Sequence, residues 1–211
     1  MRWIPDTQLV DLNEIEGLPA GLGEFSGQAY AVRRFDREPE GLVQIEDFAQ
    51  LFGIFPEQKY KKANYRAIGR VLSIETGAAG VAEFIRRLVF NTLIGNADMH
   101  LKNWSLIYPD GRTPALSPGY DFVSTIPYLA DNTAALNFSR TKEMTELSRD
   151  ELIHLAGRAA LSEKLVINTA AETVTRFREL WASEKTNLPL ASNVIEAIDA
   201  HAPTVPIYSE F

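Results

Sequence analysis

The chain of 211 residues contains no cysteine, three histidines, and no apolar run that approaches the length of a membrane span. Without cysteine, disulfides, thiol nucleophiles and cysteine-ligated metal sites are excluded. No segment is long and apolar enough to cross a bilayer as a helix. The opening stretch MRWIPDTQLVDL lacks the basic and apolar regions of a signal peptide. These absences fit a reducing compartment, and we expect a cytoplasmic protein that does not contact a membrane.

The chain also lacks an excess of positive charge. Its formal net charge is -7, with 21 Lys and Arg residues against 28 Asp and Glu residues. Such a surface does not attract phosphate backbones or anionic membranes, so direct nucleic-acid binding is not expected. With 45% hydrophobic and 23% charged residues, the composition is that of an ordinary globular protein with a sizeable core.

Helical periodicity dominates the chain, most strongly in GVAEFIRRLVFNTLIG at residues 80–95. Its apolar residues cover more than half of the helical circumference, which predicts a central, buried helix that ends at Gly95. Apolar residues spaced three and four apart also predict helices within residues 43–54 and 63–77. From Ser148 onward the pattern predicts helices to the C-terminus, beginning at a capping box that Ser148 forms with Glu151.

Short β segments interrupt this helical pattern. Residues 28–35, QAYAVRRF, alternate loosely and predict a strand, whereas residues 1–27 have no regular pattern. WSLIY and TPAL flank the turn dipeptide Asp110-Gly111, which predicts a short hairpin. We therefore expect a mainly α fold with small β segments, in the α+β class.

The densest group of polar residues, NADMHLKN, lies between the buried helix and the hairpin. Asp98 and Asn103 come just after the helix, and the hairpin can bring Asp121 close to Asn103. An Asp and an Asn side by side offer the hard oxygen ligands that Mg²⁺ prefers. A second Asp, five positions before the Asn, can accept a proton from an attacking hydroxyl.

Phosphoryl transfer needs this combination of a base, magnesium ligands and neutralising cations. His100 and Lys102 are the candidate cations near the phosphates. Asp and Asn are also common in turns and helix caps, and the spacing D-x-x-x-x-N occurs often by chance, so a purely structural role stays open. The YDF sequence after the hairpin supplies a second part of the catalytic pattern.

These residues resemble HipA-type serine/threonine kinases, the toxins of bacterial toxin–antitoxin modules. LIGNADMHLKNWSLIY, followed by LSPGYDFVSTIP, looks like their catalytic segment. YAVRRFDR at residues 30–37 looks like their hinge, and EDFAQLFGIFPEQKY at residues 46–60 looks like the helix and loop that follow. The resemblance covers most of the chain in the right order and implies a protein-kinase-like C-terminal lobe of the HipA type.

The resemblance implies a role for each matching residue at the reacting phosphate. Asp98 would be the catalytic base, and His100 and Lys102 would lie at the phosphates of ATP. Asn103 and Asp121 would hold Mg²⁺. The implied cofactors are therefore ATP and Mg²⁺, and the implied reaction is transfer of the γ-phosphate to a protein serine or threonine.

On the nucleotide side, the resemblance implies that the backbone around Arg33 and Phe35 meets the adenine. His100 would also contact the bound nucleotide, and Tyr120 would support Asp121. HipA-type kinases resemble eukaryotic kinases in layout but replace their H-R-D and D-F-G sequences, and this chain likewise reads Asn96-Ala97-Asp98 and Tyr120-Asp121-Phe122.

The resemblance breaks down before the hinge. Family members are considerably longer, and their N-terminal part carries a sheet, a phosphate-covering loop and a lysine that pairs with the α/β-phosphates. Here Lys59 is the first lysine. Residues 1–40 would thus be a remnant of the N-terminal lobe with the hinge strand, and residues 41–211 the C-terminal lobe. GLGEFSG at residues 21–27 departs by one residue from a nucleotide-binding glycine spacing, and we interpret it as an ordinary loop.

Three classes of function follow from these observations. The first is a serine/threonine kinase lobe, inactive without a complementing N-terminal lobe, with a translation factor or aminoacyl-tRNA synthetase as its implied substrate. Its expected partners are a HipB-like antitoxin or a separate N-lobe subunit. The second is a non-catalytic interaction module, or a degenerate toxin remnant, that binds an antitoxin or partner subunit. The third is a metal-dependent hydrolase that uses Asp98, His100 and Asp121.

A lobe that lacks its partner is also expected to expose apolar side chains where that partner would pack. The candidates are Phe25, Tyr30, Val32 and Phe35.

Overall fold

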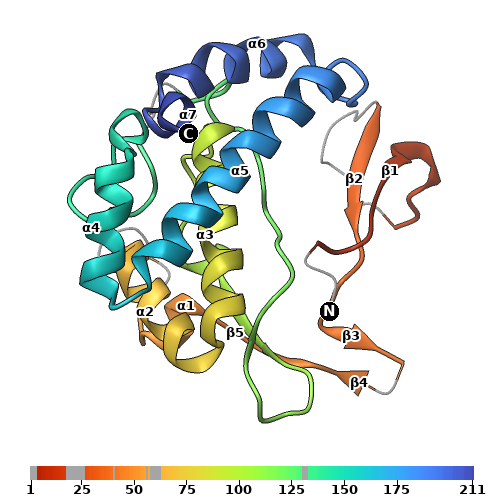
Figure 1. Cartoon of the computed structure of the whole chain (residues 1–211). Helices are drawn as coiled ribbons and strands as arrows, with labels where there is room; N and C mark the ends of the chain where they lie inside the picture. Colours follow the sequence, from red (N-terminus) through yellow and green to blue (C-terminus); the bar gives the residue numbers. More distant parts are fainter. Residues whose placement is uncertain (1–3, 18–26, 40, 56, 58–62, 130–132) are drawn as a thin grey trace.

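A computed structural model shows a body of packed helices with small β-sheets along one side (Figure 1). Within the described part of the chain, no helix is both long and apolar enough to cross a membrane. Phe25 and all but the last residue of the glycine-rich stretch 21–27 fall outside it. The structure describes residues 4–17, 27–39, 41–55, 57, 63–129 and 133–211.

The helix expected to be central is the centre of the body. It is α3 (Gly77–Leu93), and 11 of its 17 residues are buried. Two helices cover it, α2 (Tyr65–Glu75) on one side and the long α5 (Glu163–Glu184) on another. Figure 1 shows α5 passing diagonally across α3. The prediction of a central, buried helix is therefore confirmed. Its apolar residues cover much of its circumference because it shares one core with both α2 and α5.

The next helix, α4 (Arg149–Ala159), packs on α2 and α5. Its N-terminus confirms half of the expected capping box, since Ser148 Oγ accepts a hydrogen bond from the Glu151 amide at 3.1 Å. The other half was wrong. The buried Glu151 carboxylate instead accepts the backbone amides of Ser139 and Arg140 at 2.8 and 2.7 Å, because these preceding residues bring three donors, including the Arg140 side chain, to it.

Two further helices close the C-terminal side of the body. They are α6 (Ser192–His201) and the short α7 (Ile207–Glu210). His201 Nε2 lies 2.8 Å from the backbone oxygen of Thr92, so α6 is hydrogen-bonded directly to the last turn of α3. The expectation of helices from Ser148 to the C-terminus is thereby confirmed.

A three-stranded antiparallel sheet lies next to the start of the helical body. Its order is β5-β6-β7, formed by β5 (Gln44–Asp47), β6 (Ser105–Tyr108) and β7 (Ala115–Leu116). β6 and β7 are the hairpin predicted from the Asp110-Gly111 turn. β5 pairs with the outer edge of β6, which places Ile45 opposite Ile107.

The helix expected within residues 43–54 was wrong over its first half. Residues 44–47 form β5, and only α1 (Phe48–Leu51) is helical. The start of α1 is fixed by a capping box, in which Asp47 Oδ1 accepts the Gln50 amide and Gln50 Oε1 accepts the Asp47 amide. The backbone before Asp47 is left extended, and it gains hydrogen bonds to β6.

The N-terminal residues are more regular than their pattern suggested. β1 (Thr7–Asp11) pairs antiparallel with β2 (Gln28–Val32). The strand expected over residues 28–35 is confirmed up to Val32 and was wrong over residues 33–35, where the chain enters a turn. Neither strand has a fully buried residue, and Figure 1 shows this hairpin at the margin of the molecule. A second small hairpin, β3 (Arg37–Glu38) and β4 (Gly41–Leu42), leads into β5.

Gly95 is where α3 ends, and its replacement tests the turn that follows. Its φ is 69°, and a Cβ there would lie 2.5 Å from a side-chain carbon of Ile126. Gly111 has a φ of 71° with open space around it. Both Gly→Ala changes strain the backbone by about 1–2 kcal/mol, and only Gly95→Ala adds a clash. We expect a clearly lower midpoint of urea unfolding for Gly95→Ala; equal midpoints would show that Ile126 moves aside at little cost.

Arg87 on α3 tests the polar contacts inside the body. Its side chain is 4% exposed, with Nε donating to Glu83 Oε1 at 2.9 Å and Nη2 donating to the Ser117 carbonyl at 2.8 Å. Burial lowers the pKa of Arg87, and the Glu83 carboxylate opposes that shift. Arg87→Ala leaves a buried carboxylate without this partner, which costs roughly 3–5 kcal/mol.

The matched control is Arg86→Ala. The Arg86 side chain is 39% exposed and also contacts Glu83, at 3.3 Å. Exposed ion pairs contribute about 1 kcal/mol or less. We therefore expect urea unfolding to separate the two variants by at least about 2 kcal/mol. Similar losses for both would contradict the structural role of Arg87.

Candidate functional site

The polar stretch after α3 forms a closed loop, which brings together Asp98 and Asn103. Asn103 Nδ2 donates to the Asp98 carbonyl at 2.9 Å. The His100 amide donates to the same carbonyl at 2.8 Å, and the Asn103 amide donates to the His100 carbonyl at 3.0 Å. This winding leads into a 3₁₀ turn at Leu101–Asn103 and then into β6. The Asp98 carboxyl side chain is 44% exposed, so a substrate can reach it.

Asp121 belongs to a separate segment, which follows β7. It is an exposed residue with φ of 60°, a left-handed conformation that is uncommon outside glycine. Such strained positions cluster at functional sites, where the surrounding structure holds them in place. The backbone after it is fixed by Thr125, whose Oγ1 accepts the Ala97 amide at 2.8 Å and whose amide donates to the Gly95 carbonyl at 3.1 Å.

Asn96 connects the two segments directly. Its Oδ1 accepts the Asp98 amide at 3.0 Å, and its Nδ2 lies 3.3 Å from the Asp121 carbonyl. Asp98 and Asp121 are thus each one hydrogen bond away from the same side chain. The structure therefore brings the loop that carries Asp98 and Asn103 next to the segment that carries Asp121.

These residues fit a hard divalent cation. Asn103 uses its amide nitrogen toward Asp98, which leaves Oδ1 as an acceptor, and the Asp121 carboxylate is exposed. One amide oxygen and one carboxylate, completed by water and phosphate oxygens, are what Mg²⁺ takes in phosphoryl-transfer sites. Among the residues that the structure describes, no cluster of three or more His, Asp or Glu side chains could hold a metal. Asp98, His100 and Asp121, the residues of the alternative metal-dependent hydrolase, therefore do not form such a cluster.

The two candidate cations lie differently. His100 is buried, with Nε2 at 3.9 Å from Asp98 Oδ1. Lys102 is exposed, and its carbonyl accepts a hydrogen bond from the Tyr120 hydroxyl at 2.7 Å. His100 is thus placed to contact the Asp98 carboxylate, whereas Lys102 is free to extend into solvent or toward a bound anion.

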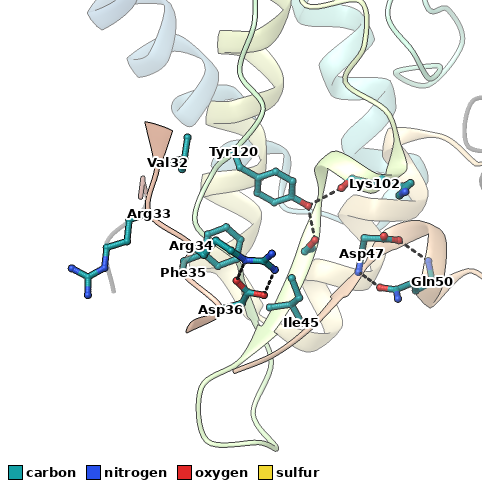
Figure 2. Close-up of a pocket in the computed structure, with 11 residues that line it drawn as sticks. Val32, Arg33, Arg34, Phe35, Asp36, Ile45, Asp47, Gln50, Lys102 and Tyr120 are labelled. Atoms are coloured by element: carbon teal, nitrogen blue, oxygen red, sulfur yellow. Dashed lines mark hydrogen bonds and ion pairs between the residues drawn. The ribbon is translucent and has the colours of Figure 1, made fainter. Parts of the chain in front are cut away.

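An open pocket of about 320 Å³ adjoins this loop, between the segment after β2 and the sheet (Figure 2). Four of the expected site residues line it, namely Arg33, Phe35, Lys102 and Tyr120. The Arg33 side chain points away from Tyr120 and Lys102 in Figure 2, so its backbone is what faces the pocket. The other expected residues, Asp98, His100, Asn103 and Asp121, do not line it. The remaining lining residues are Val32, Arg34, Asp36, Ile45, Asp47, Gln50 and Ser105.

Tyr120 stands at the boundary between the pocket and the Asp98 loop. Its hydroxyl lies 2.6 Å from Ser105 Oγ and donates to the Lys102 carbonyl, as Figure 2 shows. Its ring lies 5.7 Å from the ring of Phe35. Burial raises the pKa of Tyr120 to about 12, so the phenol stays protonated and keeps its donor. Tyr120 therefore joins the hinge segment to the loop and immediately precedes Asp121.

A charged pair lines the pocket's other wall. The Arg34 guanidinium donates to both carboxylate oxygens of Asp36, at 2.9 and 2.6 Å. These hydrogen bonds from Arg34 lower the pKa of Asp36, and Arg37 approaches the same carboxylate at 3.2 Å. The pair fixes the backbone bend after Phe35, because Asp36 is buried and its carbonyl accepts the Val43 amide at 3.1 Å.

Sequence reasoning missed several residues of this site. Asn96, Asn91 and Thr125 carry the hydrogen bonds that connect its two segments, and Asn96 and Asn91 are at most 1% exposed. In the sequence Asn96 directly follows Gly95, at a position where a polar residue is usually an exposed helix cap, so the local pattern pointed away from burial. Asn96 is buried because residues 121–125 return to the end of α3, and no local pattern shows this return.

Comparison with known proteins gives the family. Residues 5–181 match the family model of the HipA-like C-terminal domain. A Sinorhizobium fredii protein named "Putative kinase Y4dM" is 69% identical over 209 residues, which cover 99% of this chain and 51% of that protein. The chain thus spans about half the length of this relative.

Two solved structures share the fold. A structure of the Shewanella oneidensis HipA, HipB and operator DNA complex contains a chain with a TM-score of 0.74 and 19% identity, over 97% of this chain and 50% of that one. The Helicobacter pylori proinflammatory kinase CtkA gives a TM-score of 0.51 and 14% identity, over 99% of this chain and 80% of that one.

These matches confirm the expected architecture, a mixed α+β fold of the kinase-like C-terminal lobe type. Since the family model covers most of the residues, this chain belongs to the family of HipA-like C-terminal domains.

Proposed function

We propose that this chain is the nucleotide- and metal-binding lobe of a HipA-type serine/threonine kinase. The observation that carries the proposal is the meeting of Asp98, Asn103 and Asp121, from two separate segments, beside a pocket lined by residues 32–36. A base and two hard oxygen ligands next to a nucleotide-sized pocket are the parts that phosphoryl transfer to a hydroxyl requires.

The residues divide the chemistry as follows. Asp98, with its half-exposed carboxylate, accepts the proton of the attacking protein hydroxyl. Asn103 Oδ1 and the Asp121 carboxylate are the Mg²⁺ ligands, and the bound ion supplies neutralisation of phosphate charge. His100 and Lys102 contribute positive charge and hydrogen bonds at the phosphates.

The pocket supplies the adenine site. The Arg33 amide donates to the Asp6 carbonyl at 2.9 Å, whereas the Arg34 and Phe35 amides donate to no backbone carbonyl among the described residues. These two amides are therefore available to donate to the edge of a base. The paired rings of Phe35 and Tyr120 give this site an apolar wall.

The chain is proposed to be inactive alone and to act with a complementing N-terminal lobe. Leu9, Tyr30 and Val32 are 41, 67 and 41% exposed, and they lie on one face of the β1–β2 hairpin, because Leu9 pairs with Tyr30 and Thr7 with Val32. Phe35, by contrast, is half-buried against Tyr120. A two-stranded sheet with an exposed apolar face is marginally stable unless another domain covers it.

The same reasoning supports the finer proposals about partners. The Shewanella neighbour is in a complex with HipB and operator DNA, so a HipB-like antitoxin is a proposed partner of this protein. Its proposed substrate is a protein hydroxyl, in a translation factor or aminoacyl-tRNA synthetase. The exposed hairpin face also favours a second function, a non-catalytic module that binds an antitoxin or partner subunit.

Nucleotide binding by the isolated chain tests the metal site. We expect calorimetry to show ATP binding that tightens with Mg²⁺, and Asp121→Ala to weaken it in Mg²⁺ by about tenfold or more, the usual loss on removing a charged ligand. Asp150→Ala is the matched control, because it removes another exposed carboxylate, on α4. Equal affinities for wild type and Asp121→Ala, in Mg²⁺ and in EDTA alike, would contradict the assignment of Asp121.

Catalysis tests the need for a second lobe. We expect negligible ATP turnover by the chain alone, since the sequence offers no lysine before Lys59 and a positioned cation contributes about 100–1,000-fold to such reactions. Adding the part of the Sinorhizobium relative that this chain does not match, as a separate polypeptide, should raise the rate by a similar factor.

The control for that experiment is Tyr30→Asp, which places a charge on the exposed hairpin face. It should abolish stimulation without changing Mg²⁺-ATP binding by the isolated chain. Turnover by the chain alone at the rate of the full-length relative would overturn the proposed dependence. Binding of the added half without any turnover would favour the non-catalytic module.

A further inference from the structure

Asn96 has every polar atom of its side chain hydrogen-bonded and is 0% exposed. Its Oδ1 accepts the Asp98 amide, and its Nδ2 contacts the Asp121 carbonyl and Asn91 Oδ1, the last at 2.8 Å. The backbone amide of Asn96 also donates to the Asn91 backbone carbonyl, at 2.9 Å. A buried amide with all of its partners is strongly constrained, because rotating it would leave donors and acceptors unpaired.

The orientation of the Asn96 amide is set from α3. Asn91 Nδ2 donates to the Arg87 carbonyl at 2.9 Å, one turn earlier in the helix. Asn91 must therefore present Oδ1 to Asn96, and this oxygen requires the nitrogen of Asn96 opposite it. Asn96 Oδ1 is consequently the atom that faces the Asp98 amide. The flipped amide would place two donors together at Asp98 and two oxygens together at Asp121.

We infer that Asn96 is a positioning residue that holds the Asp98 loop and the Asp121 segment at a fixed separation. The inference rests on the proposed function for the roles of Asp98 and Asp121, and it adds the group that sets their geometry. Asp121 has φ of 60°, and the hydrogen bond from Asn96 to its carbonyl supports that conformation. Base and metal ligand must be held closely, because small displacements of reacting groups cost large factors in rate.

A second connection lets the variants fold. Thr125 joins the same two segments through the Ala97 amide and the Gly95 carbonyl, at 2.8 and 3.1 Å. Removing the Asn96 side chain thus leaves the segments attached, while the positions of Asp98 and Asp121 lose their shared support. Far-ultraviolet circular dichroism and urea unfolding would verify that each variant is folded.

Two substitutions separate the roles of the Asn96 atoms. Asn96→Ala removes both connections. Asn96→Asp has nearly the same shape and keeps an oxygen for the Asp98 amide, but it turns the donor toward Asp121 into a repelling oxygen. Asn64→Asp is the control for the added charge, because Asn64 caps α2 only by accepting the Ala67 amide at 3.0 Å, which Asp also does.

The first readout is amide hydrogen exchange of the chain without nucleotide. In Asn96→Ala we expect the Asp98 amide to exchange about tenfold faster, the factor expected from losing one hydrogen bond. Amides in the middle of α5 should be unchanged. In Asn96→Asp the Asp98 amide should stay protected. An unchanged exchange rate of the Asp98 amide in Asn96→Ala would overturn the inference, whatever the ATP affinities of the variants are.

The second readout is the ratio of the ATP dissociation constant in EDTA to that in Mg²⁺. Both Asn96 variants should lower this ratio by about 10–100-fold, the range seen when a group that orients metal ligands is removed. Their affinity in EDTA should equal that of wild type and of Asn64→Asp. A general loss of ATP affinity with an unchanged ratio would assign Asn96 a structural role only and would overturn the inference. If wild type itself shows no Mg²⁺ dependence, the proposed function fails, and the exchange experiment alone decides whether Asn96 positions Asp98.

Discussion

A row of buried polar side chains along α3 supports the two segments of the candidate site that carry Asp98 and Asp121. Glu83, Arg87 and Asn91 are spaced four residues apart on one face of the helix, and none is more than 7% exposed. Arg87 reaches the Ser117 carbonyl, just before the Tyr120–Asp121 segment, and Asn91 reaches Asn96. Because α3 packs between α2 and α5, both segments that carry Asp98 and Asp121 are attached to the central helix of the body.

The parts of the fold that local patterns specify could be predicted. The apolar periodicity of α3 and α5 and the Asp110-Gly111 turn are properties of consecutive residues, so their elements form where expected. β5 could not be predicted in this way, because its partner β6 lies some 60 residues later, and the spacing of Ile45, Phe48 and Phe52 imitates a helix. The capping pair Asp47 and Gln50 was the local signal that the helix begins only at Phe48.

The candidate site also has a part that the sequence could predict and a part that it could not. The spacing of Asp98 and Asn103 and the position of Asp121 after a hairpin were enough to expect their proximity, and the structure brings them together. The functions of these residues stay predictions. What the sequence could not show is how their proximity is enforced, since a polar residue such as Asn96 after a helix end is ordinarily an exposed cap. Its complete burial follows from the return of the Asp121 segment across the end of α3.

The two sides of the pocket differ in their support. One side is formed by β5, β6 and Tyr120, which are joined to the core through Ser105 and the Lys102 carbonyl. The other side, residues 32–36, lies at the end of the β1–β2 hairpin, whose two strands contain no buried residue. On the proposed function, the Asp98 loop and the Asp121 segment beside the pocket are ready in the isolated chain, whereas the adenine side of the pocket gains its rigidity only when a partner covers Leu9 and Tyr30. Affinity for metal-bound phosphates and affinity for the adenine base would then respond to different changes, the first to α3 and the second to the hairpin.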